Sequence, residues 1–197
     1  MIKLLIFDIG DVIVRFSEYD YMHYIAKKRK LSYRKLSRAL MPLIAQMELG
    51  HLTVKNMEEI IDLKFGLHDS TMEWNEGYKK LARLNEPVRN LVARLSKKYM
   101  VVLLTNVSES RYDIMSRSFI RRIPNKRVFT SCHLNLRKPD ARIYKRVLTD
   151  MKVKPSEAVF VDNMLVNVKG ARRVGIKSIQ FRNYPQLVSD LKKIKVL

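Results

Sequence analysis

Three polar residues directly follow apolar stretches of this chain, and a fourth lies between two of those stretches. Residues of these four types could carry out phosphoryl transfer. Asp8 follows four apolar residues, Thr105 follows the run YMVVLL, Asp162 follows AVFV, and Lys138 lies between Thr105 and Asp162 in the sequence. Phosphoryl transfer needs a nucleophile, hydrogen-bond donors for the phosphoryl oxygens, a cation near the developing charge, and hard oxygen ligands for a metal ion. These four residue types can supply all of these functions.

The elements that must position these residues alternate between strands and helices. Four segments rich in apolar residues predict buried strands: residues 3–14, 99–104, 158–161 and 176–181. Helical spacing of apolar residues lies between them, as in the segment after Pro139. Such alternation, with polar residues at strand ends, predicts an α/β fold with a doubly wound, mostly parallel sheet. Ligands of such sheets bind at the carboxyl ends of the strands.

A separate helical region follows the first predicted strand. Apolar residues recur there at intervals of three and four, and Thr53 is a predicted helix N-cap. We expect two domains: a core of residues 1–14 and 87–197, and a helical cap of residues 15–86. Trp74 and Tyr78, near the end of the cap, could line a substrate cavity, although packing between cap helices is the favoured interpretation.

Composition limits the class of protein. Of the 197 residues 47% are hydrophobic, which favours a folded chain, and a single Cys132 excludes a disulfide framework or a cysteine-rich zinc site. The scattered histidines show no metal-ligand spacing. No apolar run approaches the length of a membrane helix, and no signal-peptide pattern precedes FDIGD, so we expect a soluble, cytoplasmic protein without membrane contact.

Positive charge is the unusual feature of the composition. The chain has 39 Lys and Arg against 19 Asp and Glu, a formal net charge of +20. Residues 101–197 alone hold 21 basic and 7 acidic side chains. Solvated helix faces are the simplest explanation, but so basic a protein attracts polyanions. Charge alone therefore keeps nucleic acid open as a partner.

The sequence resembles the haloacid dehalogenase-like (HAD) superfamily in four segments that occur in the family's order: FDIGDV, LLTN, RKPDARIY and FVDNMLVNVKGA. The resemblance extends from residue 3 to about residue 181. It is particularly similar to the glucose-1-phosphate phosphatase-like and epoxide hydrolase N-terminal-like subgroup. The resemblance implies a Rossmann-like HAD core with a helical cap inserted after the first strand, and a Mg²⁺-dependent phosphatase.

Roles for individual residues follow from this resemblance. Asp8 would be the nucleophile that becomes an aspartyl phosphate, and would also bind Mg²⁺. Lys138 would neutralise the charge of the nucleophile and of the phosphoryl group. The phosphoryl oxygens would be bound by Thr105 and Asn106, the metal by Asp162 and Asn163, and the metal-binding loop would be oriented by Asn167.

Two positions depart from the family pattern. Gly10 stands where most phosphatases of the superfamily have the acid that protonates the leaving oxygen, although its backbone carbonyl can still bind the metal. Asn163 stands where the principal metal-binding Asp is usual, so weaker Mg²⁺ binding is expected. Asp11 is a candidate replacement for the missing acid, but successive residues leaving a strand point to opposite faces.

The leading hypothesis is a HAD-like phosphatase acting on a small phosphorylated metabolite, with a sugar phosphate as one candidate. A catalytically degenerate binding or scaffold protein is the alternative favoured by Gly10 and Asn163. A nucleic-acid-associated phosphatase is supported only by charge. Haloacid dehalogenation is disfavoured because that chemistry does not require the metal-binding loop, yet Gly10 keeps it open.

Overall fold

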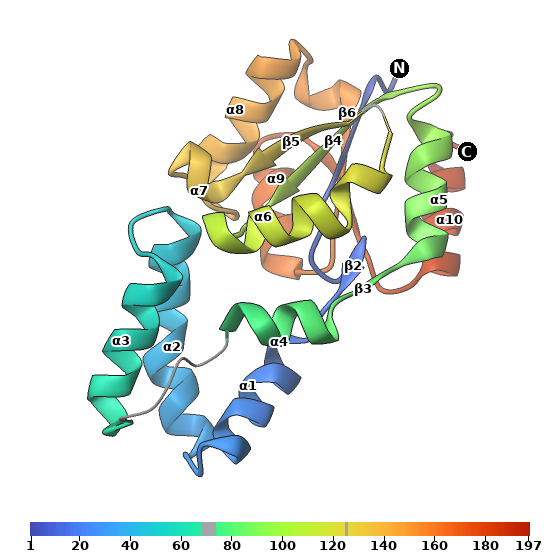
Figure 1. The fold of residues 1–197 in the computed structure, drawn as a ribbon. Helices are drawn as coiled ribbons and strands as arrows, with labels where there is room; N and C mark the ends of the chain where they lie inside the picture. Colours follow the sequence, from blue (N-terminus) through green and yellow to red (C-terminus); the bar gives the residue numbers. More distant parts are fainter. Residues whose placement is uncertain (68–73, 125) are drawn as a thin grey trace.

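The computed structural model describes residues 1–67, 74–124 and 126–197. A five-stranded parallel sheet with strand order β5-β4-β1-β6-β7 forms its centre (Figure 1). Its strands are β1 (Leu4–Phe7), β4 (Met100–Thr105), β5 (Lys126–Thr130), β6 (Ala158–Asp162) and β7 (Lys177–Gln180). The predicted α/β fold with a parallel sheet is confirmed.

Helices cover both faces of the sheet, so its central strands β4, β1 and β6 are apolar apart from Thr105 and Asp162 at their carboxyl ends. Alternate residues of a strand point to opposite faces. Leu5 and Phe7 share one apolar cluster with α5 (Glu86–Leu95), α6 (Glu109–Ser118) and α10 (Tyr184–Lys193). Leu4 and Ile6 share the other with α8 (Ala141–Met151) and α9 (Leu165–Arg173). Three short helical elements complete the core: η1 (Ile120–Arg122), α7 (Ser131–Leu134) and η2 (Pro155–Glu157).

The predicted helical region consists of α1 (Glu18–Lys28), α2 (Tyr33–Glu48), α3 (Val54–Phe65) and α4 (Trp74–Leu81). A two-stranded antiparallel ribbon, β2 (Val14–Arg15) and β3 (Arg83–Leu84), joins these helices to the sheet. The Thr53 hydroxyl accepts a hydrogen bond from the backbone N–H of Asn56 at 3.1 Å, which confirms the predicted N-cap. Figure 1 shows the four helices at one end of the sheet.

The prediction of a single strand over residues 3–14 is wrong after Phe7. The carbonyl of Ile9 accepts hydrogen bonds from the backbone N–H groups of Ile13 and Val14, at 2.9 and 2.8 Å, and so closes a tight turn. Asp11 has a left-handed backbone, with φ of 53°, and its Oδ1 accepts a hydrogen bond from Phe16 N at 3.0 Å. The apolar residues of this segment are buried as a turn rather than as a strand.

None of the helices in the described ranges is long and apolar enough to span a lipid bilayer.

Candidate active site

The register of the sheet brings Asp8 and Asp162 together at its carboxyl edge. Phe7 is paired with Val161 of β6 and with Leu103 of β4. Asp8 is the next residue after Phe7, and its N–H donates to Val161 O at 2.8 Å. Asp162 ends β6 and Thr105 ends β4, so the three predicted strand-end residues lie on adjacent strands.

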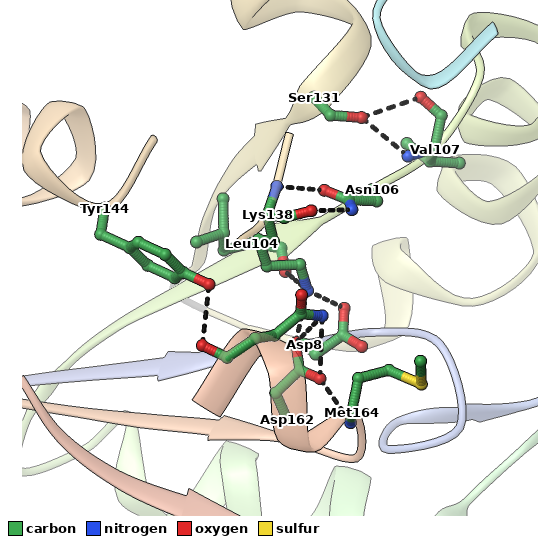
Figure 2. Close-up of polar contacts among 10 residues, drawn as sticks. Asp8, Leu104, Asn106, Val107, Ser131, Lys138, Tyr144, Asp162 and Met164 are labelled. Atoms are coloured by element: carbon green, nitrogen blue, oxygen red, sulfur yellow. Dashed lines mark hydrogen bonds and ion pairs between the residues drawn. The ribbon is translucent and has the colours of Figure 1, made fainter. Parts of the chain in front are cut away.

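Lys138 links the two carboxylates (Figure 2). Its Nζ lies 2.8 Å from Asp8 Oδ1 and 2.7 Å from Asp162 Oδ2, and also donates to Leu104 O at 3.0 Å. The residue is only 2% exposed. An ammonium group has three donors, and all three are used by these contacts. The structure thus places Lys138 beside the carboxylates, while direct binding of substrate by Lys138 stays a prediction.

The side chain of Asn106 holds the backbone of Lys138. Its Oδ1 accepts from Lys138 N and its Nδ2 donates to Lys138 O, both at 2.9 Å. Ser131 in turn fixes the loop after Asn106, since its Oγ accepts from Val107 N at 2.9 Å (Figure 2). Because its side chain is used in this way, Asn106 can offer a substrate mainly its backbone N–H. Sequence reasoning did not find the roles of the Asn106 and Ser131 side chains.

Asp162 is held by donors from the start of α9. Its Oδ1 accepts from Met164 N at 2.7 Å, and Asn167 Nδ2 lies 3.0 Å from Oδ2 and 3.2 Å from Oδ1. Asn167 thus contacts the Asp162 carboxylate, while its role in orienting a metal-binding loop stays a prediction. Gly170 lets α9 approach the Lys138 segment closely, since a Cβ there would lie 2.7 Å from Pro139 O.

The positions that depart from the family pattern flank this cluster. Gly10 is exposed, and a Cβ built on it would meet no atom within 4 Å. Asn163 is half-buried beside Asp162, and its carbonyl accepts from Gln180 Nε2 at 3.2 Å. The Asp11 side chain hydrogen-bonds within its own turn, so the structure gives it a local structural role. Its role as the replacement acid stays a hypothesis.

The site combines two buried carboxylates with one ammonium group. Burial raises the pKa of Asp8 from 3.8 to about 7, and the Asp162 carboxylate also raises it, whereas Lys138 acts in the opposite direction. Burial alone would lower the pKa of Lys138, but its ion pairs with Asp162 and Asp8 outweigh burial and hold that pKa above its ordinary value. Ionising Asp8 is therefore costly unless further positive charge is present.

The pKa of Asp8 predicts how the stability of the metal-free protein depends on pH. Between about pH 4 and pH 7 folded Asp8 keeps a proton that unfolded Asp8 has released. Its contribution to the free energy of unfolding should fall as pH rises through this window, by at most about 1.4 kcal/mol per pH unit. Urea denaturation in EDTA gives the free energy of unfolding at each pH, and the contribution of Asp8 is the difference in that free energy between wild type and Asp8→Asn. A difference that does not change with pH would contradict the assignment.

Removing the ammonium group should destabilise the fold strongly. Lys138→Met leaves Asp8 and Asp162 facing each other without a counter-charge, and breaking a buried ion pair in this way costs about 3–5 kcal/mol. Urea denaturation at neutral pH in EDTA measures the loss, with Lys145→Met as the control because Lys145 is exposed. Equal effects of the two substitutions would rule out the buried charge cluster.

The donor set at the carboxyl edge fits Mg²⁺. In the described ranges no three His, Cys, Asp or Glu side chains cluster as a metal site by themselves. Mg²⁺, however, usually takes one or two protein carboxylates and completes its shell with other oxygens. Asp8 and Asp162 supply two carboxylates, and Gly10 and Asn163 follow them with a carbonyl and an amide oxygen. One ammonium does not balance two carboxylates, which leaves negative charge for a cation to neutralise.

Helix α2 and the residue that follows it contact the segment that leads to Lys138. Glu48 at the end of α2 accepts from Arg137 Nε at 3.0 Å, and Leu49 O accepts from Asn135 Nδ2 at 2.8 Å. The space between α2, Trp74 and the loop after Thr105 measures only about 10 Å³. This volume is about that of one water-sized probe. Asn106 lines this space, whereas Asp8, Lys138 and Asp162 do not.

Trp74 and Tyr78 pack inside the helical region and are 1% and 3% exposed. Their rings, together with that of Phe16, surround the guanidinium group of Arg111 at centroid distances of 5.1, 4.9 and 5.3 Å. Arg111 belongs to α6 of the core, so these cation–π contacts join the cap helices to the core. The favoured interpretation as packing residues is confirmed, and Trp74 also lines the small space beside the site.

Comparison with known proteins agrees with this geometry. The family model for haloacid dehalogenase-like hydrolases matches residues 2–175. The match covers most of the chain, so the protein belongs to the haloacid dehalogenase-like hydrolase family, as the four sequence segments indicated.

Two curated relatives illustrate the range of the family. Bifunctional epoxide hydrolase 2 of Rattus norvegicus is 30% identical over 116 residues, covering 56% of this chain and 21% of the relative. Drimenol cyclase of Aspergillus calidoustus is 22% identical over 200 residues, covering 98% of this chain and 37% of the relative. The chain thus spans only a minor part of either protein.

A solved structure shows the same fold over nearly the whole chain. It is a HAD family enzyme from Bacteroides thetaiotaomicron in complex with magnesium and inorganic phosphate. The TM-score is 0.79 at 20% sequence identity, and the alignment covers 95% of this chain and 99% of the other. At this identity the likeness establishes a common fold.

Proposed function

We propose that this HAD-like hydrolase is a Mg²⁺-dependent phosphatase that uses Asp8 as its nucleophile and a small phosphorylated metabolite as its substrate. The observation that carries the proposal is the buried cluster in which Lys138 Nζ contacts both Asp8 and Asp162. Ion pairs with a purely structural role are usually exposed, whereas this cluster is buried. A carboxylate that has a strongly raised pKa and lies at the carboxyl edge of a parallel sheet is typical of a functional site. The magnesium and phosphate bound by the Bacteroides enzyme support the same chemistry.

The reaction would proceed in two displacements. An Asp8 carboxylate oxygen attacks phosphorus, a P–O bond forms, and the ester P–O bond breaks to release the leaving group as an alkoxide, which takes its proton from water. Water then attacks phosphorus of the aspartyl phosphate, which releases inorganic phosphate and restores the Asp8 carboxylate. Lys138 keeps Asp8 oriented and partly neutralises its charge throughout. The Thr105 hydroxyl and the Asn106 N–H are proposed to hold the phosphoryl oxygens.

Mg²⁺, when bound by Asp8, the Gly10 carbonyl, Asp162 and Asn163, would supply positive charge against the phosphoryl oxygens. The protein's own contribution is to fix the two carboxylates. Asp162 is held by Met164 N and by Asn167, and Asp8 by the register of β1. With Asn163 in place of a third carboxylate, half-maximal activation should require a higher Mg²⁺ concentration than in a site with three carboxylates.

Gly10 affects the choice of substrate. With no acid at position 10, the leaving oxygen must depart without protonation from that side chain, and a positioned proton donor contributes typically 10²- to 10⁴-fold in rate. Substrates with acidic leaving groups, such as acyl or aryl phosphates, should therefore react faster than alkyl phosphates. A sugar 1-phosphate, or another ester whose leaving group is stabilised, is a more suitable candidate than a simple alkyl ester.

Residues 15–86 are proposed to act as a cap domain over the core of residues 1–14 and 87–197. A shift of these helices relative to the core is proposed to admit the substrate. Their return would exclude water and limit the size of the substrate.

Hydrolysis of acetyl phosphate and p-nitrophenyl phosphate, with Mg²⁺ or with EDTA, tests the proposal. We expect Mg²⁺-dependent turnover, with acetyl phosphate the better substrate. Absence of turnover with both compounds at every Mg²⁺ concentration would contradict the proposal and favour the catalytically degenerate binding protein.

A further inference from the structure

The edge of the sheet opposite the candidate active site is lined with lysines. Each of the five strands begins at or shortly after at least one of them. We call this set the amino-edge lysines: Lys126 for β5, Lys97 and Lys98 for β4, Lys3 for β1, Lys152 and Lys154 for β6, and Lys177 for β7. All are exposed except Lys126, which is half-buried. Neighbouring strands are about 4.8 Å apart, so this row extends over about 19 Å.

Little negative charge balances the row. In the segments that hold these lysines, residues 1–3, 97–100, 126–127, 152–157 and 176–178, the only acidic residue is Glu157. Its Oε1 pairs with Lys3 Nζ at 2.6 Å. The uncompensated charge here agrees with the excess of basic residues in the second half of the chain. A one-sided row of cations is an electrostatic footprint for a polyanion.

A hollow of about 710 Å³ opens on this edge. Four lysines and Glu157 line it, and Leu148, Val153 and Pro155 give it apolar walls. The lysines are Lys3, Lys145, Lys152 and Lys154. Its volume lies within the range of pockets that hold a small organic group. Apolar surface beside lysines suits a nucleotide, whose base and sugar can lie on the apolar atoms while its phosphates reach the ammonium groups.

We propose that the amino-edge lysines bind a single strand of nucleic acid through its phosphate backbone, with one nucleotide seated in the hollow. The row of lysines can follow successive phosphates of one strand, and the apolar atoms of Leu148, Val153 and Pro155 offer a surface for a base. Lysine ammonium groups are point charges that bind phosphates without reading bases. Binding is therefore independent of sequence and does not distinguish RNA from DNA.

This binding surface is separate from the proposed phosphatase site. Lys3 and Asp8 lie at opposite ends of β1, five residues apart in the chain, which corresponds to about 16 Å. Figure 1 shows the amino terminus at the end of the sheet away from α1–α4. A strand bound at the amino edge thus does not reach Asp8 of the same molecule. The nucleic acid is a binding partner rather than the substrate, and the inference does not depend on the proposed function.

Fluorescence anisotropy with labelled twelve-nucleotide oligo-dT and oligo-U tests the inference at several salt concentrations. For two to four phosphate contacts we expect log K to fall against log salt with a slope between about −1.4 and −2.8, for both oligonucleotides. The combined variant Lys145→Glu, Lys152→Glu, Lys154→Glu should weaken binding by at least about tenfold and flatten the slope. Asp8→Asn should bind like the wild type.

The control has the same charge change on the cap. Lys35, Arg38 and Lys64 line a second basic hollow, of about 370 Å³, and the combined variant Lys35→Glu, Arg38→Glu, Lys64→Glu alters it. This control should keep most of the affinity. If this triple variant of the hollow does not fold, Lys145→Gln with Lys154→Gln replaces it and should still flatten the slope. Equal loss in the control, no salt-dependent binding by the wild type, or binding to phosphatidylserine vesicles but not to oligonucleotides would each overturn the inference.

Discussion

Gly10→Asp is expected to raise the rate of hydrolysis of alkyl phosphates by roughly 10²- to 10⁴-fold. A carboxyl group two residues after the nucleophile could protonate the leaving oxygen and then activate water. The backbone accepts the change, because a Cβ at Gly10 meets no atom within 4 Å and Gly10 is not among the residues with positive φ. The site therefore lacks a proton donor at position 10, and there is space for an aspartate side chain there.

The measurement is kcat/KM for an alkyl phosphate and for acetyl phosphate, in wild type and in Gly10→Asp. The gain should be large for the alkyl ester and small for acetyl phosphate, whose leaving group needs little protonation. Gly10→Asn is the matched control, since it fills the same space without a titratable proton. A similar gain in Gly10→Asn, or an equal gain for both substrates, would show that proton donation is not the cause.

Asp8→Asn should reduce turnover by roughly 10⁴- to 10⁶-fold, as expected when the nucleophile of a covalent mechanism is removed. The amide has the same shape and can still contact Lys138, but it cannot form the aspartyl phosphate. Steady-state hydrolysis of acetyl phosphate measures the effect, and urea denaturation checks the fold. Retention of more than a tenth of the activity would exclude Asp8 as the nucleophile.

Asp11→Asn tests whether Asp11 replaces the missing acid, and it also serves as a control for the loss of turnover in Asp8→Asn. Asparagine keeps an Oδ1 that can accept from Phe16 N, so the turn after β1 should be preserved. If Asp11 has only this structural role, the relative rates of alkyl and acyl phosphates will stay as in the wild type. A selective loss of alkyl phosphate hydrolysis would instead identify Asp11 as the replacement acid.

Much of the fold and the placement of the site could be predicted from the sequence. Strong apolar runs that end in polar residues located β1, β4 and β6, and the parallel arrangement then required Asp8, Thr105 and Asp162 to meet at one edge. These inferences depend on local patterns and on a general rule of sheet topology. They did not require knowledge of which side chains touch.

Other features depend more on three-dimensional packing than on local pattern. Gly10 and Asp11 are residue types that favour turns, but the apolar residues on both sides of them made residues 3–14 resemble one strand. The edge strand β5 begins with the charged residues Lys126 and Arg127, so it was not predicted. Asn106 could be expected to assist a phosphate, but its contact with the backbone of Lys138, 32 residues away, appears only in the folded chain.

The most direct test of the central claim is whether Asp8 becomes phosphorylated. The wild-type protein is mixed with acetyl phosphate and Mg²⁺, quenched in acid within milliseconds, and digested for mass spectrometry. The account predicts one added phosphoryl group on the peptide that contains Asp8, and none on the same peptide from Asp8→Asn. Turnover of acetyl phosphate with the phosphoryl group on another residue, or with no covalent adduct at any quench time, would contradict it.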